Sequence, residues 1–246
     1  MVSFGTGKAG FMSGTRRTSP RTSRQTVLRL SMRVWDASTR LFYWTTALLV
    51  AFSFLSVNQG WAQLHYLAGY GVLALLLFRL AWGFVGSETS RFSHFLRGPP
   101  AVFSQLRHIG RREPDNEIGH SAAGGWLALL LLLALAVDVV SGLFSHGLDS
   151  FGSAGPLAHL TGTAAGDWID RVHAIDSDVV LGLIALHVLA IIAYAVLKRQ
   201  NLLRPMITGR KRLPGHFRQP HTASPLLALM LLALAACVVW VIATRI

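Results

Sequence analysis

Apolar residues occur along this chain in five stretches of about twenty residues each. They lie near residues 41–58, 65–86, 122–144, 173–197 and 224–243. A helix of about twenty residues crosses the roughly 30 Å hydrocarbon core of a bilayer. Helices of soluble proteins carry a polar face, but the run from Trp126 to Val137 has no polar position. The pattern therefore predicts an integral membrane protein with five transmembrane helices in a lipid bilayer.

The composition and the distribution of charge support this interpretation. Hydrophobic residues make up 52% of the chain and charged residues 14%, against roughly a quarter charged in ordinary soluble domains. The formal net charge of +12 could suggest a nucleic-acid partner, but 20 of the 23 Lys and Arg residues lie in segments 1–40, 87–119 and 198–222. These segments alternate with 59–64 and 145–172, as the positive-inside rule requires. The charge therefore predicts a cytoplasmic N-terminus and a periplasmic C-terminus, and no nucleic-acid binding.

Polar residues within the apolar stretches are the candidates for function, because burying them in a membrane is costly. His173 and His187 lie on the fourth stretch, 14 residues apart. This interval is about four helical turns, or roughly 21 Å, and returns both rings to nearly the same face. Imidazole is a common axial ligand of haem, and two haems stacked across a bilayer require about this separation. The spacing therefore favours two haem sites over a proton relay.

The second stretch carries a matching pair of polar residues. His65 begins the second stretch at the same outer level at which His173 begins the fourth, so the two can act as axial ligands of one outer haem. Arg79 follows His65 by 14 residues, which directs it to the inner level, where it can pair with a haem propionate. Each residue alone also fits a hydrogen-bonding or interfacial role, and Arg79 could reach the headgroups. Asp138 is expected to complete a hydrogen-bond network. Surface positions are expected for the histidines at 94, 108, 146, 159, 216 and 221.

Short motifs distributed over residues 33–212 resemble those of a known family. They include Val34-Trp-Asp36, Thr39-Arg-Leu-Phe42, Leu64-His65, Gly69-Tyr70, Phe78-Arg79-Leu-Ala-Trp-Gly83, Gly119-His120, Ser141-Gly-Leu-Phe144, Val172-His173, Ala185-Leu-His187 and Asn201-Leu-Leu-Arg204. As a set they resemble the bacterial cytochrome b561 and nickel-iron hydrogenase b-type cytochrome family. The resemblance implies a four-helix core with two b-type haems, located in the bacterial inner membrane. It also implies electron transfer between the quinone pool and a partner redox protein or subunit, such as a cytochrome c or a hydrogenase-like subunit.

The resemblance also implies the ligand sets. His65 and His173 would bind the outer haem, and His187 the inner one. The second inner ligand should come from the first helix, where the family has a His between Phe and Trp, but this chain has Tyr43. A phenol ionises near a pKa of about 10 and binds iron poorly when neutral. Four possibilities follow for the inner haem: ligation by Tyr43, a five-coordinate iron, ligation by His120, or no haem at all. We favour a perturbed haem anchored by His187.

The expected fold is an all-α membrane bundle, with a four-helix haem-binding core over residues 33–212 and a fifth transmembrane helix after it. Residues 1–31 are expected to form a basic, disordered extension, and residues 213–246 a linker and the extra helix. An alternative function is a redox-silent or single-haem anchor subunit for a partner oxidoreductase. A small-molecule transporter would require inverted repeats or interrupted helices, and the sequence has neither.

The charge distribution predicts the orientation of the chain. Reporter domains fused at positions 60 and 160 should report a periplasmic location, and those at 100 and 210 a cytoplasmic one, because Lys and Arg are retained inside. A cytoplasmic reporter at 160 would reverse the orientation and the assignment of the outer and inner sites.

Overall fold

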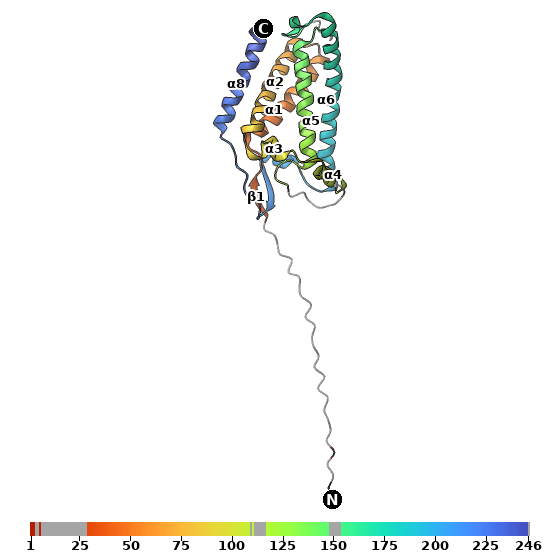
Figure 1. The fold of residues 1–246 in the computed structure, drawn as a ribbon, viewed down its shortest axis with the longest axis vertical. Coiled ribbons are helices and arrows are strands. Elements are labelled where there is room, and N and C mark those ends of the chain that lie inside the picture. Colours follow the sequence, from red (N-terminus) through yellow and green to blue (C-terminus); the bar gives the residue numbers. More distant parts are fainter. Residues whose placement is uncertain (3–4, 6–28, 109, 111–116, 148–153, 246) are drawn as a thin grey trace.

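The computed structural model describes residues 1–2, 5, 29–108, 110, 117–147 and 154–245. Most of the proposed N-terminal extension lies outside these residues. Five long helices stand side by side (Figure 1), and each is long and apolar enough to cross a membrane. They are α1 (Ala37–Asn58), α2 (Ala62–Val85), α5 (Ala122–Phe144), α6 (Thr163–Leu197) and α8 (Pro225–Arg245). The predicted all-α membrane bundle with five spans is therefore confirmed.

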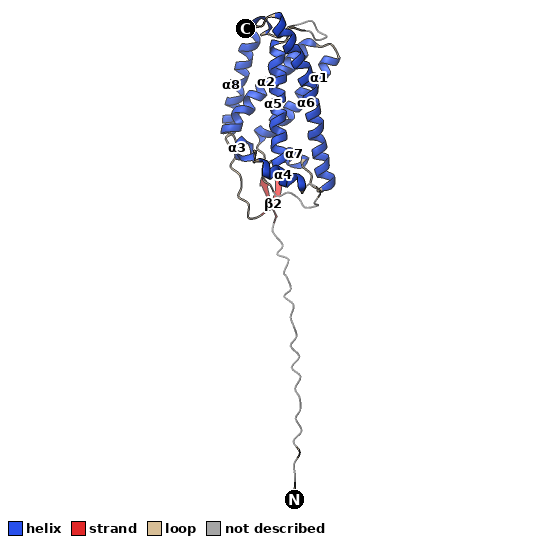
Figure 2. Cartoon of the chain, turned by 45° about the vertical axis from the view of Figure 1, so that its right-hand side comes forward, coloured by secondary structure: helices blue, strands red, loops and turns tan. Residues whose placement is uncertain are grey.

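Short elements gather at one end of the bundle, which we call the sheet end (Figure 2). Two strands pair there as an antiparallel sheet, with Arg33 opposite Arg210. The opposite end carries the connections between α1 and α2 and between α5 and α6, together with the C-terminus (Figure 1). The short elements are β1 (Arg29–Arg33), η1 (Glu88–Ser90), α3 (Phe92–Phe95), α4 (Pro99–Arg107), α7 (Leu203–Thr208) and β2 (Arg210–Pro214), while η2 (Ala158–Leu160) lies at the opposite end.

Two boundaries differ from the sequence prediction. Residues 29–31, assigned above to the extension, form the start of β1. Helix α6 begins at Thr163 rather than near 173, so the last ten residues of the predicted 145–172 loop are helical. Its first turns contain the charged residues Asp167, Asp170 and Arg171. A prediction based on apolar runs does not include such residues in a membrane helix. At 35 residues, α6 is roughly 50 Å long and extends beyond the hydrocarbon core.

The four helices of the family-like core meet in an apolar layer. Helix α1 packs against α2, and α5 against α6, while α2 also contacts α5. Val50, Val72, Leu135 and Val180 belong to one buried cluster with members from all four helices, and Val180 is fully buried. Val180 lies seven residues from both His173 and His187 on α6. The layer therefore separates the two levels of the bundle at which these histidines stand.

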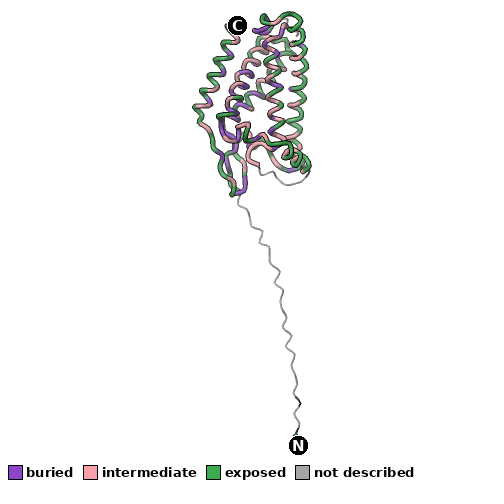
Figure 3. Tube along the Cα trace, viewed as in Figure 1, coloured by how far each residue is buried: buried purple, intermediate pink, exposed green. Residues whose placement is uncertain are grey.

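Helix α8 lies outside this core, against α2 (Figure 1). Its small residues Ala228 and Ala235 share a buried cluster with Phe78 and Trp82 of α2, and small residues allow close contact between membrane helices. The remaining faces of α6 and α8 are largely exposed (Figure 3). Exposed apolar side chains on membrane-spanning helices face lipid.

The linker before α8 is attached to the sheet end through Glu88. Its carboxylate accepts two hydrogen bonds of 3.0 Å from Arg218 and one of 2.8 Å from the His221 N–H. The Glu88 N–H donates in return to the His221 carbonyl at 3.0 Å. The His221 hydrogen bond, with the charge of Arg218, holds the pKa of Glu88 below its usual value despite partial desolvation. The carboxylate therefore remains ionised under mildly acidic conditions and keeps its partners.

Replacing Glu88 with Ala should release this linker. Trypsin should then cut after Arg218 several-fold faster in detergent-solubilised protein, because a set of charge-assisted hydrogen bonds is lost. Glu117→Ala is a matched control, since Glu117 pairs with Arg97 at 2.8 Å elsewhere on the surface. Equal cleavage rates in the wild type and in the Glu88 variant would contradict the role assigned to Glu88.

Candidate functional site

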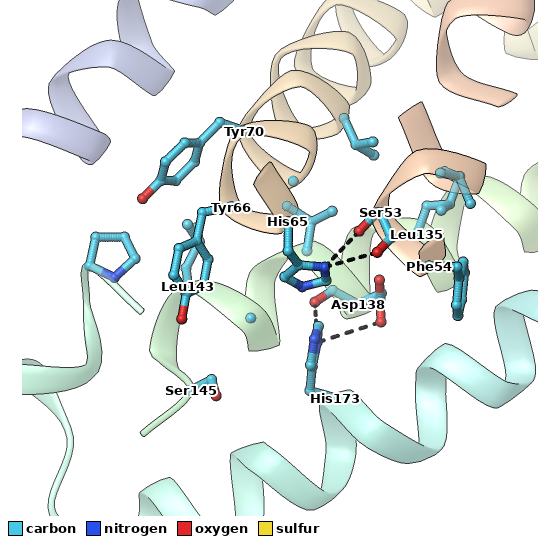
Figure 4. Close-up of a pocket in the computed structure, with 16 residues that line it drawn as sticks. Ser53, Phe54, His65, Tyr66, Tyr70, Leu135, Asp138, Leu143, Ser145 and His173 are labelled. Atoms are coloured by element: carbon cyan, nitrogen blue, oxygen red, sulfur yellow. Dashed lines mark hydrogen bonds and ion pairs between the residues drawn. The ribbon is translucent and has the colours of Figure 1, made fainter. Parts of the chain in front are cut away.

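A cavity lies between the four core helices in the half of the bundle away from the sheet end. It is partly open to the outside. All four core helices contribute to its lining (Figure 4). The polar residues and aromatic rings around it include Ser53, Phe54, His65, Tyr66, Tyr70, Asp138, Ser145 and His173.

The structure brings His65 and His173 together in this cavity, although they are far apart in sequence. His65 lies one turn into α2, and His173 lies in the interior of α6 rather than at its start. Their ring centroids are 6.4 Å apart, and the ring planes are nearly perpendicular. Imidazole nitrogens bind a metal at about 2 Å, so two rings on opposite sides of one metal have centroids roughly 6 Å apart. The pair therefore has the separation that a shared metal requires.

Both rings are held through the same nitrogen. Nδ1 of His173 lies 2.8 Å from the Asp138 carbonyl oxygen, and Nδ1 of His65 lies 3.3 Å from the Ser53 carbonyl oxygen and 3.0 Å from the Ser53 hydroxyl (Figure 4). A carbonyl oxygen can only accept, so Nδ1 carries the hydrogen in both rings. The lone pair is then on Nε2. Metal-binding histidines are typically oriented in this way by their surroundings.

Two glycines shape the space around the rings. Gly69 lies one turn after His65 and lines the cavity, and a methyl group added there would have no atom within 4 Å. Such a group would project into open space that a planar ligand can use. Gly142 lies under His173, where an added methyl group would come within 3.1 Å of the ring. Any larger residue at 142 would press on His173.

A second cluster surrounds His120 at the sheet end of the bundle. The Tyr43 hydroxyl is 3.5 Å from His120 Nε2, at the long limit of a hydrogen bond. Trp35 and Phe95 pack on the His120 ring, with centroid distances of 4.7 and 4.9 Å. His120 Nδ1 is buried and has no hydrogen-bond partner among the described residues. Tyr43 and His120, which the sequence treats as alternative ligands, are therefore direct neighbours.

Arg79 is buried in the same half of the bundle, and no described residue forms an ion pair with it. Only 1% of its surface is exposed, and none of its three guanidinium nitrogens has a hydrogen-bond partner among the described residues. Its guanidinium carbon lies 4.9 Å from the Phe92 ring centroid and 5.7 Å from that of Phe95. These aromatic faces favour a cation but do not replace an anion. The arrangement is suited to an anionic group entering from outside the chain.

His187 has a more open position on α6. Its side chain is exposed in the absence of any ligand, and no described contact joins it to Tyr43. It lies within electrostatic range of His120, however. Burial, followed by the nearby charges of Arg79 and His187, lowers the pKa of His120 to about 3. His120 is therefore neutral at physiological pH.

Sequence reasoning missed the groups that orient the histidines. Ser53 had no assigned role, and the Asp138 contribution through its carbonyl cannot be read from side-chain chemistry. Ser141, whose hydroxyl is 3.2 Å from His173 Nδ1, belongs to the family-like motif Ser141-Gly-Leu-Phe144. That motif was the sequence signal from which its role could have been found. The structure groups His65 with His173, and Tyr43 with His120 and Arg79. Among the described residues, no group of three His, Cys, Asp or Glu side chains could hold a bare metal ion.

These features define a class of protein, the multi-pass helical membrane proteins that carry histidine pairs between their helices, as membrane cytochromes do. The family model described as prokaryotic cytochrome b561 matches residues 34–209. The chain therefore belongs to the prokaryotic cytochrome b561 family. No curated protein and no solved structure matches it. The family match predicts haem b binding, electron transfer and a multi-pass location in a bacterial membrane.

The residues present fit haem b. The His65–His173 separation, the tautomer set by Nδ1 and the open space beside Gly69 agree with two axial imidazoles and a flat macrocycle. The unpaired Arg79 guanidinium agrees with a propionate. Helix α8 starts beyond the matched residues, so its packing on α2 is an addition to the family core.

Proposed function

We propose that this membrane b-type cytochrome transfers electrons between the quinone pool and a partner redox protein or subunit. Membership of the family supports electron transfer, and the donor and acceptor are the proposal. The observation that carries it is the His65–His173 pair, with both Nδ1 atoms bonded to backbone carbonyls. Such a pair suits a low-spin centre that changes little in geometry between oxidation states.

In the proposed outer site, His65 and His173 would hold the haem iron through Nε2. Bound haem b supplies a centre that accepts and releases single electrons. Ser53 and the Asp138 carbonyl keep each imidazole in the tautomer that can bind. Tyr66 and Tyr70 line the cavity beside the pair. These residues supply the partly polar rim through which a partner would approach.

In the proposed inner site, His187 is the main anchor of a second haem, and Arg79 neutralises a propionate. The buried, unpaired guanidinium supports this assignment. Tyr43 replaces the family's histidine, so the inner coordination differs from that of the outer site. His120 offers a buried, neutral ring nitrogen, which suits hydrogen bonding to a quinone oxygen.

We also propose that the sheet end faces the cytoplasm. The connections at this end include the basic segments 198–222 and 87–119, whereas the opposite loop at 145–162 has no Lys or Arg. This asymmetry supports a bacterial inner-membrane protein with its outer site toward the periplasm.

The first test of the function concerns the outer pair. His65→Ala and His173→Ala should each abolish the same low-spin signal in reduced-minus-oxidised spectra, because each removes one axial ligand of a shared centre. The double variant should lose no more than either single variant. His159→Ala is the control, since His159 is an exposed histidine of η2 at the same end. Intact low-spin signals in both single variants would refute the pair, and purified wild-type protein without haem would favour the redox-silent anchor.

The second test concerns the inner coordination. Tyr43→His should convert the inner haem to a low-spin form with a higher potential or a higher haem-to-protein ratio, because it restores an imidazole. Tyr43→Phe keeps the ring and removes the hydroxyl, together with its contact to His120. A changed inner spectrum in Tyr43→Phe would support ligation or direct hydrogen bonding by the phenol. Two bis-histidine signals in the wild type would contradict this account and make His120 the first candidate for the missing ligand.

A further inference from the structure

The two histidines of the outer site have unequal surroundings. Both donate Nδ1–H to a backbone carbonyl, but the additional groups near the nitrogens differ. His65 has the neutral Ser53 hydroxyl at 3.0 Å. His173 has the carboxylate of Asp138, with Oδ1 at 3.5 Å from Nδ1. His173, one of the two proposed ligands, is therefore next to an anion.

Asp138 is held in this position by α6 itself. Ser177 lies one turn after His173, and its hydroxyl donates to Asp138 Oδ1 at 2.7 Å. The same hydroxyl lies 2.9 Å from the His173 carbonyl, so ligand, serine and carboxylate form one connected unit between α5 and α6. The side chains of Asp138 and His173 are each 20% exposed. Partial burial lowers the local dielectric constant and strengthens the effect of the charge.

The physical effect of such a carboxylate has a definite sign. The negative charge of a carboxylate beside the imidazole makes Nε2 a stronger electron donor. It also stabilises positive charge nearby. One-electron reduction removes the single net positive charge of an oxidised iron porphyrin with two neutral imidazoles, so the anion favours the oxidised form.

We propose that Asp138 is a positioning residue for His173 and lowers the reduction potential of the outer haem through the negative charge of its carboxylate, which lies 3.5 Å from the ligand's Nδ1. The inference rests on the proposed binding of the outer haem by His65 and His173. It assigns to Asp138 a role beyond completing a hydrogen-bond network. The outer centre is thereby tuned through His173.

The test is equilibrium redox potentiometry of the low-spin haem in membranes or in purified full-length protein. Asp138→Asn keeps the size of the side chain and the backbone carbonyl but removes the charge. The reduced-to-oxidised ratio at a fixed ambient potential should rise about tenfold, or about 59 mV for a one-electron centre. Haem content and the position of the low-spin bands should remain those of the wild type. Glu117→Gln is the matched control, because it also replaces a carboxylate with its neutral amide, but at the sheet end where Glu117 pairs with Arg97, and it should leave the potential unchanged.

The remaining outcomes also decide the proposal. An unchanged potential in Asp138→Asn, or an equal shift in Glu117→Gln, would overturn it. Should the Asn variant fail to assemble, Asp138→Ala removes the same charge and is expected to shift the potential in the same direction. Loss of the haem in both variants would reduce Asp138 to a structural role and also overturn the proposal. Failure of the haem assignment itself is distinguishable, since His173→Ala would then leave the wild-type low-spin signal intact.

Discussion

Polar groups buried between these helices must find their partners inside the protein, because the core of a bilayer offers no water. A helix satisfies its own backbone, but a buried imidazole has two nitrogens to accommodate. Here the backbone carbonyls of Ser53 and Asp138 accept hydrogen bonds from Nδ1 of His65 and His173, respectively. This leaves Nε2 as the atom with a lone pair in both rings. The requirement to satisfy buried polar atoms thus orients the residues on which the proposed function depends.

The same constraint explains the separation into two levels. The layer around Val180 is built from apolar side chains of all four core helices, and polar groups gather on either side of it. On one side lies the histidine pair, and on the other lie Arg79, Tyr43 and His120. An unpaired buried guanidinium is costly unless an anion joins it. The inner level is therefore incomplete without a ligand, whereas the polar contacts at Nδ1 of the outer pair lie within the chain.

The sequence predicted the parts that depend on apolar length and on helical periodicity. Five spans, their order and the approach of His65 to His173 follow from these two quantities. The start of α6 at Thr163 did not follow, because its polar first turns carry no membrane signal. The pairing of β1 with β2 joins residues far apart in the chain, and no local pattern indicates it. The neighbours of His120 also escaped prediction, since the loop before α5 is positioned by tertiary contacts with Trp35 and Phe95.

The β1–β2 sheet has a consequence for how the protein is made. Arg33 in β1 pairs with Arg210 in β2, so the first strand cannot pair until four membrane-spanning helices have left the ribosome. At usual rates of synthesis this delay is on the order of ten seconds or more. During that time the edges of β1 remain unpaired next to an inserting α1. Closure of the sheet therefore marks the completion of the four-helix core. A chain truncated before residue 210 could not form the sheet.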